Sequence, residues 1–379
     1  MNSLPSDSVS RGRDAPRSHG STAVVYCEAN FGELDGKTAN GLVRYSDRYE
    51  ILSVIDSRRA GLDAGEFLDG VPNGIRVDRD MDSAINRLGR VPEVFIFGMA
   101  PASGMLSTRE REVVLDAVAR GMDIVNGLHE FLNDDPEFVA AALAHDVTIL
   151  DVRRPKAKAD LRVFSGRIFD VACPRIAVLG TDGAIGKRTT ATVLTRALSA
   201  RGIRAVMVGT GQTSLIQGAK YGVALDAVAP QFCSGEVEAA VVDAFEQESP
   251  DVIIIEGQGA LSHPAYLTSA YILRGSRPAG VILQHAPKRG VLGDFPMLPM
   301  PTPASEINLI QTFADTRVIG LTINHEHMTD AEVEAAIVAY EFELGLPVTD
   351  ALTRSPDRLV QMVLTAFPAL EGKAVPSLR

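Results

Sequence analysis

The stretch that decides the fold is Arg175-Ile-Ala-Val-Leu-Gly-Thr-Asp-Gly-Ala-Ile-Gly-Lys-Arg-Thr-Thr190. Its apolar start predicts a buried strand, and the sequence from Arg188 onward predicts a helix. The connecting loop carries Gly180, Gly183 and Gly186, which let backbone N–H groups turn around an anion. The helix N-terminus adds the positive end of its dipole, and Lys187 adds a full charge. This order of strand, glycine-rich loop and helix predicts a P-loop α/β domain that binds phosphate groups.

The loop departs in two ways from the common pattern G-x-x-x-x-G-K-[ST]. Gly180 lies one residue too far from Gly186, a spacing that resembles the dethiobiotin-synthetase-like branch of P-loop proteins. Arg188 also stands where a serine or threonine would bind Mg²⁺, and Thr189 follows one residue late. Arginine is not a metal ligand but binds phosphate or carboxylate well. The second departure therefore weakens the case for Mg·ATP, and no metal site is expected.

A second polar group follows the apolar strand 252–256, whose last residue is Glu256. The carboxyl ends of parallel strands face the ligand in doubly wound sheets, so Glu256 should lie near the phosphate loop. It could bind a cation or act as a base, and Gln258 follows between two glycines. His263 could accept a proton. The alternative, that His263 is a capping or packing residue before Pro264, stays open.

Two further strands should end at the same edge of this sheet. The strand 280–284 precedes a polar and basic cluster that suits an anionic substrate such as a carboxylate: Gln284, His285, Lys288 and Arg289. The alternative is a solvated loop with ordinary surface charges. The strand 318–323 ends before Asn324, whose amide offers the donor and the acceptor that suit a purine edge.

The N-terminal part alternates predicted strands and helices, which implies a second parallel sheet of Rossmann-like character. Its candidate ligand loops are 28–37, 56–61 and 98–104. No G-x-G-x-x-G follows the first strand, and Asp56 after the second strand is weak evidence for NAD. We therefore interpret this domain as ancillary or as one wall of a cleft. The predicted boundaries are a disordered tail at 1–21, the Rossmann-like domain at 22–153, a linker at 154–173 and the P-loop α/β domain at 174–379.

Composition sets the remaining bounds. The 379 residues exceed one ordinary core and carry a formal net charge of -11, so binding to nucleic acid or to an anionic membrane is not expected. A phosphate-bearing ligand then needs a local positive site. The three cysteines have no paired spacing, which favours a reducing compartment, and we expect a cytoplasmic protein. We also expect a homo-oligomer, because many doubly wound enzymes pair.

Three motifs in this order, GTDGAIGKRTT, EGQGALSHPA and LQHAPKRG, closely resemble a bacterial and archaeal family long catalogued as a domain of unknown function. The family includes the D-glutamate N-acetyltransferase DgcN, and the resemblance extends from about Thr22 to the C-terminus. It implies a Rossmann-like N-terminal domain and a P-loop C-terminal domain. It also implies transfer of an acetyl group from acetyl-CoA to D-glutamate, giving N-acetyl-D-glutamate.

The resemblance also implies roles for individual residues. The phosphates of acetyl-CoA would be bound by Gly183, Gly186, Lys187, Arg188 and Thr189, and the adenine edge by Asn324. The catalytic base would be one of Glu256, His263 and Asp182. Arg289 and Lys288 would bind substrate carboxylates, assisted by Gln258 and His285. Backbone N–H groups of 257–259 would stabilise the oxyanion.

Two other functions stay open. One is a Mg·ATP-dependent ligase or small-molecule kinase of the dethiobiotin-synthetase type, and the other is a nucleotide sensor without catalysis. The kinase or ligase predicts Mg²⁺-dependent release of ADP, whereas the sensor predicts tight binding without turnover.

Overall fold

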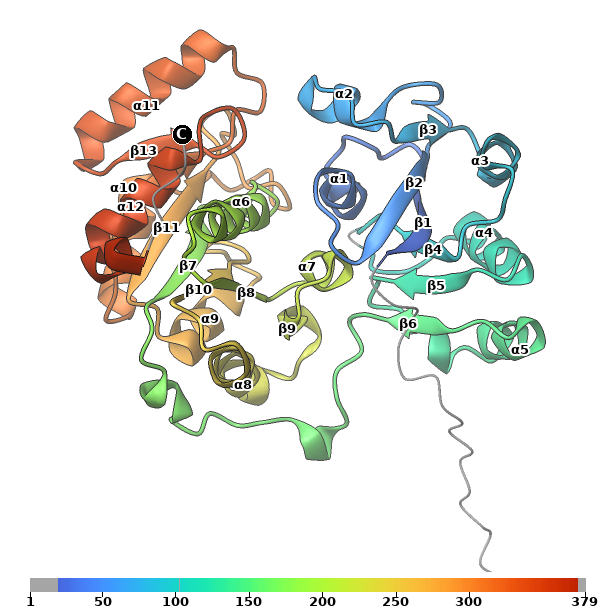
Figure 1. The fold of residues 1–379 in the computed structure, drawn as a ribbon, viewed down its shortest axis with the longest axis horizontal. Coiled ribbons are helices and arrows are strands. Elements are labelled where there is room, and N and C mark those ends of the chain that lie inside the picture. The colour runs from blue at the N-terminus through green and yellow to red at the C-terminus, as the bar shows by residue number, and fades with distance from the viewer. Residues whose placement is uncertain (1–19, 102, 374–379) are drawn as a thin grey trace, which may run out of the picture. The chain divides into compact units, whose positions relative to one another are not determined.

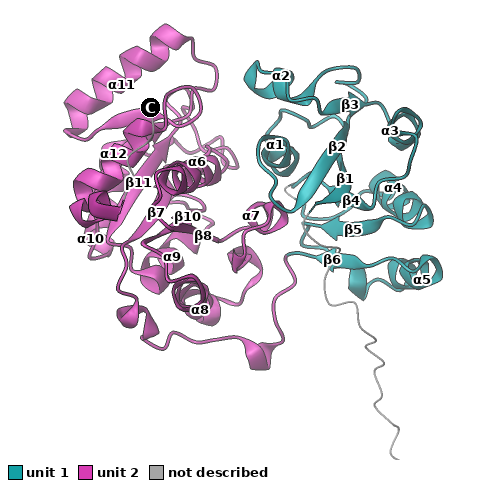
Figure 2. Cartoon of the chain, viewed as in Figure 1, with its two compact units in different colours: residues 1–152 teal, residues 153–379 magenta. Residues whose placement is uncertain are grey.

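The computed structural model describes residues 20–101 and 103–373. They form two compact units, residues 1–152 and residues 153–379 (Figure 2). The predicted tail lies almost wholly outside the described residues, and the first strand begins at Ser21. Over the described parts of the chain, no helix combines the length and the apolar character needed to cross a bilayer.

Unit 1 is a six-stranded sheet in the order β3-β2-β1-β4-β5-β6, and every pairing in it is parallel. This is the strand order of a Rossmann-like sheet, as predicted. Figure 1 shows α1 on one face of the sheet and α3 and α4 on the other. The strands are β1 Ser21–Tyr26, β2 Tyr49–Ile55, β3 Arg76–Asp78, β4 Val94–Phe97, β5 Asp123–Asn126 and β6 Ile149–Asp151. The helices are α1 Lys37–Arg44, α2 Ala64–Asp69, α3 Met81–Leu88, α4 Thr108–Ala119 and α5 Pro136–His145.

The sequence analysis does not predict α2, although both of its ends carry recognisable signals. Asp63 accepts hydrogen bonds from the backbone N–H groups of Gly65 and Glu66, and Gly70 ends the helix at a φ of 72°. The helix has only 6 residues, too few for the apolar periodicity on which the prediction depends.

Unit 2 is a seven-stranded parallel sheet in the order β13-β12-β11-β7-β10-β8-β9. The predicted P-loop strand β7 is central, and apolar clusters cover both faces of the sheet. Its strands are β7 Arg175–Gly180, β8 Ala205–Gly209, β9 Tyr221–Gly222, β10 Val252–Glu256, β11 Gly280–His285, β12 Arg317–Ile323 and β13 Val348–Asp350. Its helices are α6 Lys187–Ala200, α7 Gln212–Gln217, α8 Pro230–Glu248, α9 Thr268–Ser276, α10 Pro303–Phe313, α11 Asp330–Leu344 and α12 Asp357–Ala366.

The helix α8 begins at Pro230, in the first turn, where a missing N–H costs nothing. Two carboxylates on α8, Glu236 and Glu238, are only 4% and 2% exposed. Glu236 accepts from the backbone of Arg162, and Glu238 accepts from the backbone of Ser165. The segment 154–173, predicted to be a linker, thus packs on α8 as part of unit 2.

Candidate functional site

The phosphate loop of unit 2 lies between β7 and α6. Gly186 has a φ of 103°, which a glycine adopts without strain, and it starts the 14-residue helix α6. Lys187 is 5% exposed, and its Nζ donates to the backbone oxygen of Asp182. Side-chain space at Gly183 is open, since a Cβ there would meet no atom within 4 Å. The loop therefore combines a helix N-terminus, a buried lysine and an accessible glycine, as an anion site requires.

Asp182 braces this loop. Its carboxylate is 2% exposed and accepts from the N–H of Gly183 at 2.7 Å. The other oxygen accepts from the N–H of Gly293 at 2.9 Å and from Nη1 of Arg289 at 3.0 Å. Both oxygens are therefore occupied, an arrangement that favours a structural role over the predicted one as a base.

The two predicted carboxylate-binding cations differ in their surroundings. Arg289 bonds Asp182 through Nη1 and Glu326 through Nε at 2.9 Å, and its side chain is 14% exposed. Lys288 instead pairs with Glu332 at 2.6 Å, and both side chains are more than 40% exposed. The structure thus joins Arg289 to the phosphate loop and places Lys288 in a solvated ion pair.

Glu256 fixes the neighbouring loop after β8. It is 5% exposed, and its Oε2 accepts from the N–H groups of Thr210 at 2.8 Å and Gly211 at 3.2 Å. The hydroxyl of Ser214 donates to the same oxygen at 2.6 Å. Burial raises the pKa of Glu256, although these hydrogen bonds and the charge of Arg188 oppose the shift. Three donors on one oxygen show that this carboxylate holds the start of α7.

Two predicted binding residues contact the same region. Gln258 donates through Nε2 to the hydroxyl of Thr210 at 3.0 Å. Arg188 donates through Nη1 to Oε1 of Gln217, in α7, at 2.6 Å. Thr189 is 9% exposed in the first turn of α6. Predicted ligand residues from two loops are therefore brought together at the edge formed by β7, β8 and β10.

A close approach of the backbone holds β10 beside the phosphate strand. A Cβ on Gly257 would lie 2.1 Å from the backbone oxygen of Val178 in β7, so no larger residue fits there. The loop from Gly257 to Gly259, predicted to stabilise an oxyanion, thereby passes directly along the strand that leads into the phosphate loop.

His263 has one occupied and one unoccupied nitrogen. Its Nδ1 accepts from the N–H groups of Ala265 and Tyr266, both at 3.2 Å. The ring is 4% exposed, stacks on Tyr266 at 4.4 Å and meets Phe295 edge-on at 5.5 Å. Its Nε2 has no hydrogen-bond partner among the residues that the structure describes.

These contacts fix the protonation state of His263. Burial lowers its pKa, and the charges of Asp182 and Lys187 act on it in opposite directions. A nitrogen that accepts two N–H bonds carries no proton, so the neutral ring holds its proton on Nε2. His263 is thus a buried donor whose Nε2–H has no acceptor among the described residues, and this geometry favours donation over the predicted role as a proton acceptor.

His285 and Asn324 lie on the other side of β7. Nδ1 of His285 is hydrogen bonded to the hydroxyl of Thr181 at 2.9 Å, and burial lowers the pKa of His285 to about 4. The Nδ2 of Asn324 donates to the backbone oxygen of Ile185 at 3.2 Å, and its Oδ1 accepts from the N–H of Glu326 at 2.9 Å. Both residues brace the phosphate loop, and the amide that was predicted to contact adenine is engaged in this structure.

Gln284, predicted as part of the anion-binding cluster, and Glu306, which has no predicted role, also shape the site. Gln284 accepts at Oε1 from the hydroxyl of Thr190 at 2.6 Å, which ties β11 to α6. Glu306, in α10, is 1% exposed and accepts from the N–H of Ser262 at 3.2 Å and from its hydroxyl at 2.7 Å. The position of Gln284 at the end of a predicted strand could have indicated that it lies at the site. Nothing in the sequence near Glu306 indicates its contact with Ser262, 44 residues away.

No group of three or more His, Cys, Asp or Glu side chains among the described residues is placed to hold a metal ion. The groups at this edge offer anion binding at the start of α6 and hydrogen-bond donation by His263.

Known proteins match both units. Residues 162–360 match the P-loop domain of a family described as a domain of unknown function, DUF1611_C, and residues 57–155 match its Rossmann-like domain, DUF1611_N. A protein of Tritonibacter scottomollicae named D-glutamate N-acetyltransferase is 32% identical over 279 residues, which are 71% of this chain and 80% of that protein. A protein of a Pseudoalteromonas species with the same name is 31% identical over 278 residues, with the same two coverages of 71% and 80%.

The fold also matches a solved structure. The crystal structure of a DUF1611 family protein from Anabaena variabilis superposes with a TM-score of 0.83 at 32% identity. The match covers 91% of this chain and 100% of that one. The likeness therefore extends over both units.

Proposed function

This chain belongs to the DUF1611 family of paired Rossmann-like and P-loop domains, and from that premise we propose that it is an N-acetyltransferase that transfers the acetyl group of acetyl-CoA to the amine of D-glutamate. Two relatives at 32% and 31% identity are named D-glutamate N-acetyltransferase. The observation that carries the proposal is the phosphate loop itself. It keeps the anion-binding lysine but has Arg188, bonded to Gln217, in place of a hydroxyl ligand for Mg²⁺.

Coenzyme A carries phosphate groups that fit such a loop without being hydrolysed. The N-terminus of α6 and Lys187 would bind a phosphate group, and Lys187 would exchange the backbone oxygen of Asp182 for it. Arg188 lies in the following position and suits a second phosphate. Asn324 would reach an adenine edge only by leaving Ile185, so its predicted role depends on movement of that side chain.

The amine attacks the thioester carbon to form the amide bond, the C–S bond breaks, and coenzyme A leaves as its thiol with the proton that the amine loses. The attack places negative charge on the carbonyl oxygen, and a fixed donor stabilises that charge. His263 suits this role because its Nε2–H is buried, neutral and without an acceptor among the described residues. A donor that is already oriented by Ala265 and Tyr266 needs no reorganisation during the reaction. We assign His263 as an oxyanion donor.

An acidic substrate needs cations for its carboxylates. Arg289 and Lys288 remain our prediction, but each would have to exchange a protein carboxylate for the substrate. Lys288 holds Glu332 in an exposed pair and can make this exchange at low cost. Arg289 holds Asp182 and Glu326 and exchanges them less readily.

The test is an acetyl-transfer assay with purified protein. Acetyl-CoA and D-glutamate should release free thiol and form N-acetylglutamate, measured by thiol titration and mass spectrometry. Lys187→Ala should raise KM for acetyl-CoA by about 30-fold or more, because a charged hydrogen bond to phosphate is lost. Lys158→Ala, at an exposed lysine outside the phosphate loop, is the matched control and should behave as the unmodified protein.

Absence of thiol release with every acidic amino acid would overturn the proposal. Mg²⁺-dependent release of ADP from ATP, lost in Lys187→Ala, would instead identify a ligase or kinase. Tight binding of a nucleotide without any turnover would identify a sensor.

A further inference from the structure

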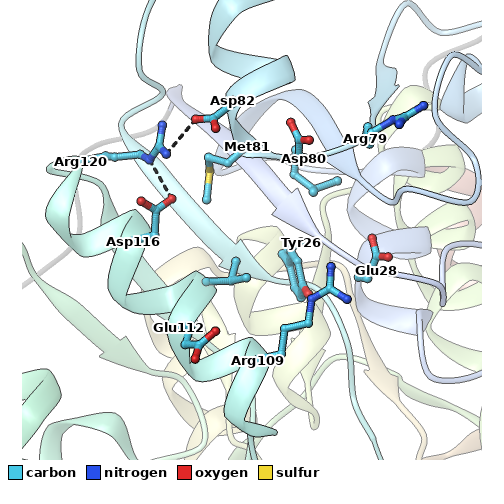
Figure 3. Close-up of a pocket in the computed structure, with 12 residues that line it drawn as sticks. Tyr26, Glu28, Arg79, Asp80, Met81, Asp82, Arg109, Glu112, Asp116 and Arg120 are labelled. Atoms are coloured by element: carbon cyan, nitrogen blue, oxygen red, sulfur yellow. Dashed lines mark hydrogen bonds and ion pairs between the residues drawn. The ribbon is translucent and has the colours of Figure 1, made fainter.

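Unit 1 has an open cavity of about 300 Å³ that no part of the proposed reaction uses. It lies at the carboxyl ends of β1 and β2, against the first turn of α3 and along the length of α4 (Figure 3). Ligands of doubly wound sheets bind at this edge. The volume is at the lower end for ligand pockets, so its occupant is a small molecule.

Tyr26, the last residue of β1, presents a polar group to this cavity. Its side chain is 4% exposed, and its hydroxyl has no hydrogen-bond partner among the described residues. Burial raises the pKa of Tyr26 to about 12, with the charge of Glu28 acting in the same direction and that of Arg109 opposing it. The phenol is therefore neutral at physiological pH and can donate a hydrogen bond to a ligand.

Opposite charges flank this hydroxyl. Figure 3 shows Arg109 extending from α4 toward the Tyr26 hydroxyl, with Glu28 nearby. Arg109 has no ion pair or hydrogen bond within the described chain, and Arg79, which precedes α3, has none either. Glu28 accepts from the N–H and the hydroxyl of Ser57 at 2.9 and 2.5 Å, and it too has no ion pair in the described residues.

The charged groups at the opposite end of the cavity are already paired with one another. Arg120 pairs with Asp82 and with Asp116, both at 2.8 Å. Among the described lining residues, the charged groups without an ion pair are Glu28 and Arg109 beside Tyr26, together with Arg79, Asp80 and Glu112.

A dinucleotide does not fit these groups. The glycine-rich turn that binds pyrophosphate would follow β1, but Glu28 stands in that turn and would repel phosphate. Asp56, the acid expected to bind a ribose, is 1% exposed and accepts from the N–H groups of Ala29 and Phe31. A ligand with a single negative charge, or with both signs, is indicated instead.

We propose that this cavity binds a small zwitterion of the amino-acid class, with its carboxylate on Arg109 and the Tyr26 hydroxyl and its ammonium on Glu28. Arginine and a phenol bind a carboxylate together, and a glutamate pairs with the ammonium. Arg79, which precedes α3, also lines the cavity, and an acidic amino acid can offer it a second carboxylate. The site goes beyond the proposed function, because binding here requires neither acetyl-CoA nor catalysis.

The test is isothermal titration of the full-length protein, without acetyl-CoA, using D-glutamate, L-glutamate and glutarate as probes. At least one glutamate enantiomer should bind, and glutarate, which has no ammonium, should bind at least 10-fold more weakly. Arg109→Ala and Glu28→Gln should each weaken glutamate binding at least 10-fold, and Tyr26→Phe should weaken it several-fold. The matched control is Arg90→Ala, which changes an exposed arginine that does not line the cavity. It should leave binding unchanged.

Lys288→Ala separates this inference from the proposed function, because Lys288 is predicted to bind the substrate carboxylate in unit 2. Glutamate binding that survives Lys288→Ala but not Arg109→Ala supports the unit 1 site, whether or not acetyl transfer is found. Binding that is unchanged in both Arg109→Ala and Glu28→Gln, or absent for both enantiomers at millimolar concentration, would overturn the site and leave the proposed reaction standing. Thermal melting and circular dichroism confirm that each variant is folded.

Discussion

Asp56 in unit 1 and Glu256 in unit 2 occupy matching positions in two parallel sheets. Asp56 directly follows β2 and is 1% exposed, whereas Glu256 ends β10 and is 5% exposed. Asp56 accepts from the N–H of Phe31 at 3.1 Å, in the loop after β1. Glu256 accepts from the N–H of Thr210 at 2.8 Å, in the loop after β8. In each unit, an acid at a strand end fixes the loop that follows a neighbouring strand.

The two edges then differ in which groups remain for a ligand. In unit 2 the turn after the central strand is glycine-rich, and it leaves Lys187 and a helix N-terminus for anions. In unit 1 the corresponding turn carries Glu28, and Tyr26 and Arg109 line a small cavity beside it. An acid at a strand end is therefore weak evidence for a ligand. A buried carboxylate needs hydrogen-bond donors from the protein to stabilise its charge, whether or not a ligand binds. The residue types in the turn are the better indicator.

The largest expected effect is a loss of kcat on substitution of His263. This substitution tests whether the residues at this edge of the unit 2 sheet carry out catalysis. His263→Ala should lower kcat by roughly 10²- to 10³-fold while KM for acetyl-CoA changes little, because one oxyanion donor is lost. His263→Gln, which can still donate from a similar position, should recover part of the loss. His145→Ala, at an exposed histidine in α5 of unit 1, is the control and should have no effect.

The pH profile separates a donor from a base at His263. Burial lowers its pKa below the ordinary value of about 6.5, so the ring is mostly neutral above that pH and kcat should not follow its ionisation there. A kcat that rises with pH through one ionisation, and loses that ionisation in His263→Gln, would identify a base. Unchanged kcat in His263→Ala would remove the residue from the reaction.

Much of the fold could be predicted from the sequence, because it depends on local patterns. The apolar run before Gly180 and the lysine after Gly186 predicted the central strand and the start of α6, and both are confirmed. The family and the parallel architecture of both units are confirmed as well. Short helices such as α7, with 6 residues, were missed because they contain less than two turns of periodicity.

The roles of side chains in the candidate site could be predicted much less well, because they depend on distant partners. Asp182 obtains Arg289 from 107 residues away, and Glu256 obtains Thr210 from 46 residues away. Nothing in the local sequence indicates that these partners occupy the carboxylates. The tautomer of His263 is set by the N–H groups of Ala265 and Tyr266, which donate to its Nδ1. The sequence alone does not show that the backbone turns back toward this nitrogen.

The second prediction tests the shared role of Glu256 and Asp56 directly. Glu256→Ala leaves three donors without their acceptor and should lower the free energy of unfolding by roughly 3 kcal/mol. Because burial raises the pKa of Glu256, Glu256→Gln resembles the protonated acid and should cost less. Asp56→Ala should cost about 2 kcal/mol, since its donors lie nearer to solvent.

Hydrogen exchange localises the two effects. Amide exchange should accelerate at residues 210–214 in Glu256→Ala and at residues 29–31 in Asp56→Ala. Neither substitution should change the exchange rates of the other unit. If Glu256→Gln is stable but inactive in acetyl transfer, Glu256 is a catalytic base and the equivalence of the two acids fails.

The smallest expected effect concerns the opposite end of β10, where Asp251 precedes the strand that Glu256 ends. Burial alone would raise the pKa of Asp251, but hydrogen bonds from Arg204 and Lys373 lower it to about 2. A carboxylate with a lowered pKa stabilises the fold above its unfolded pKa of about 4, and this contribution is lost as the pH falls toward 2. Because both partner side chains are more than half exposed, Asp251→Asn should cost only about 1 kcal/mol at pH 6. In urea unfolding, the difference from the unmodified protein should shrink between pH 4 and pH 2; a difference independent of pH would show that the ion pairs contribute nothing. The two ends of β10 would then differ: hydrogen bonds and ion pairs favour the charged form of Asp251, whereas burial disfavours the charged form of Glu256.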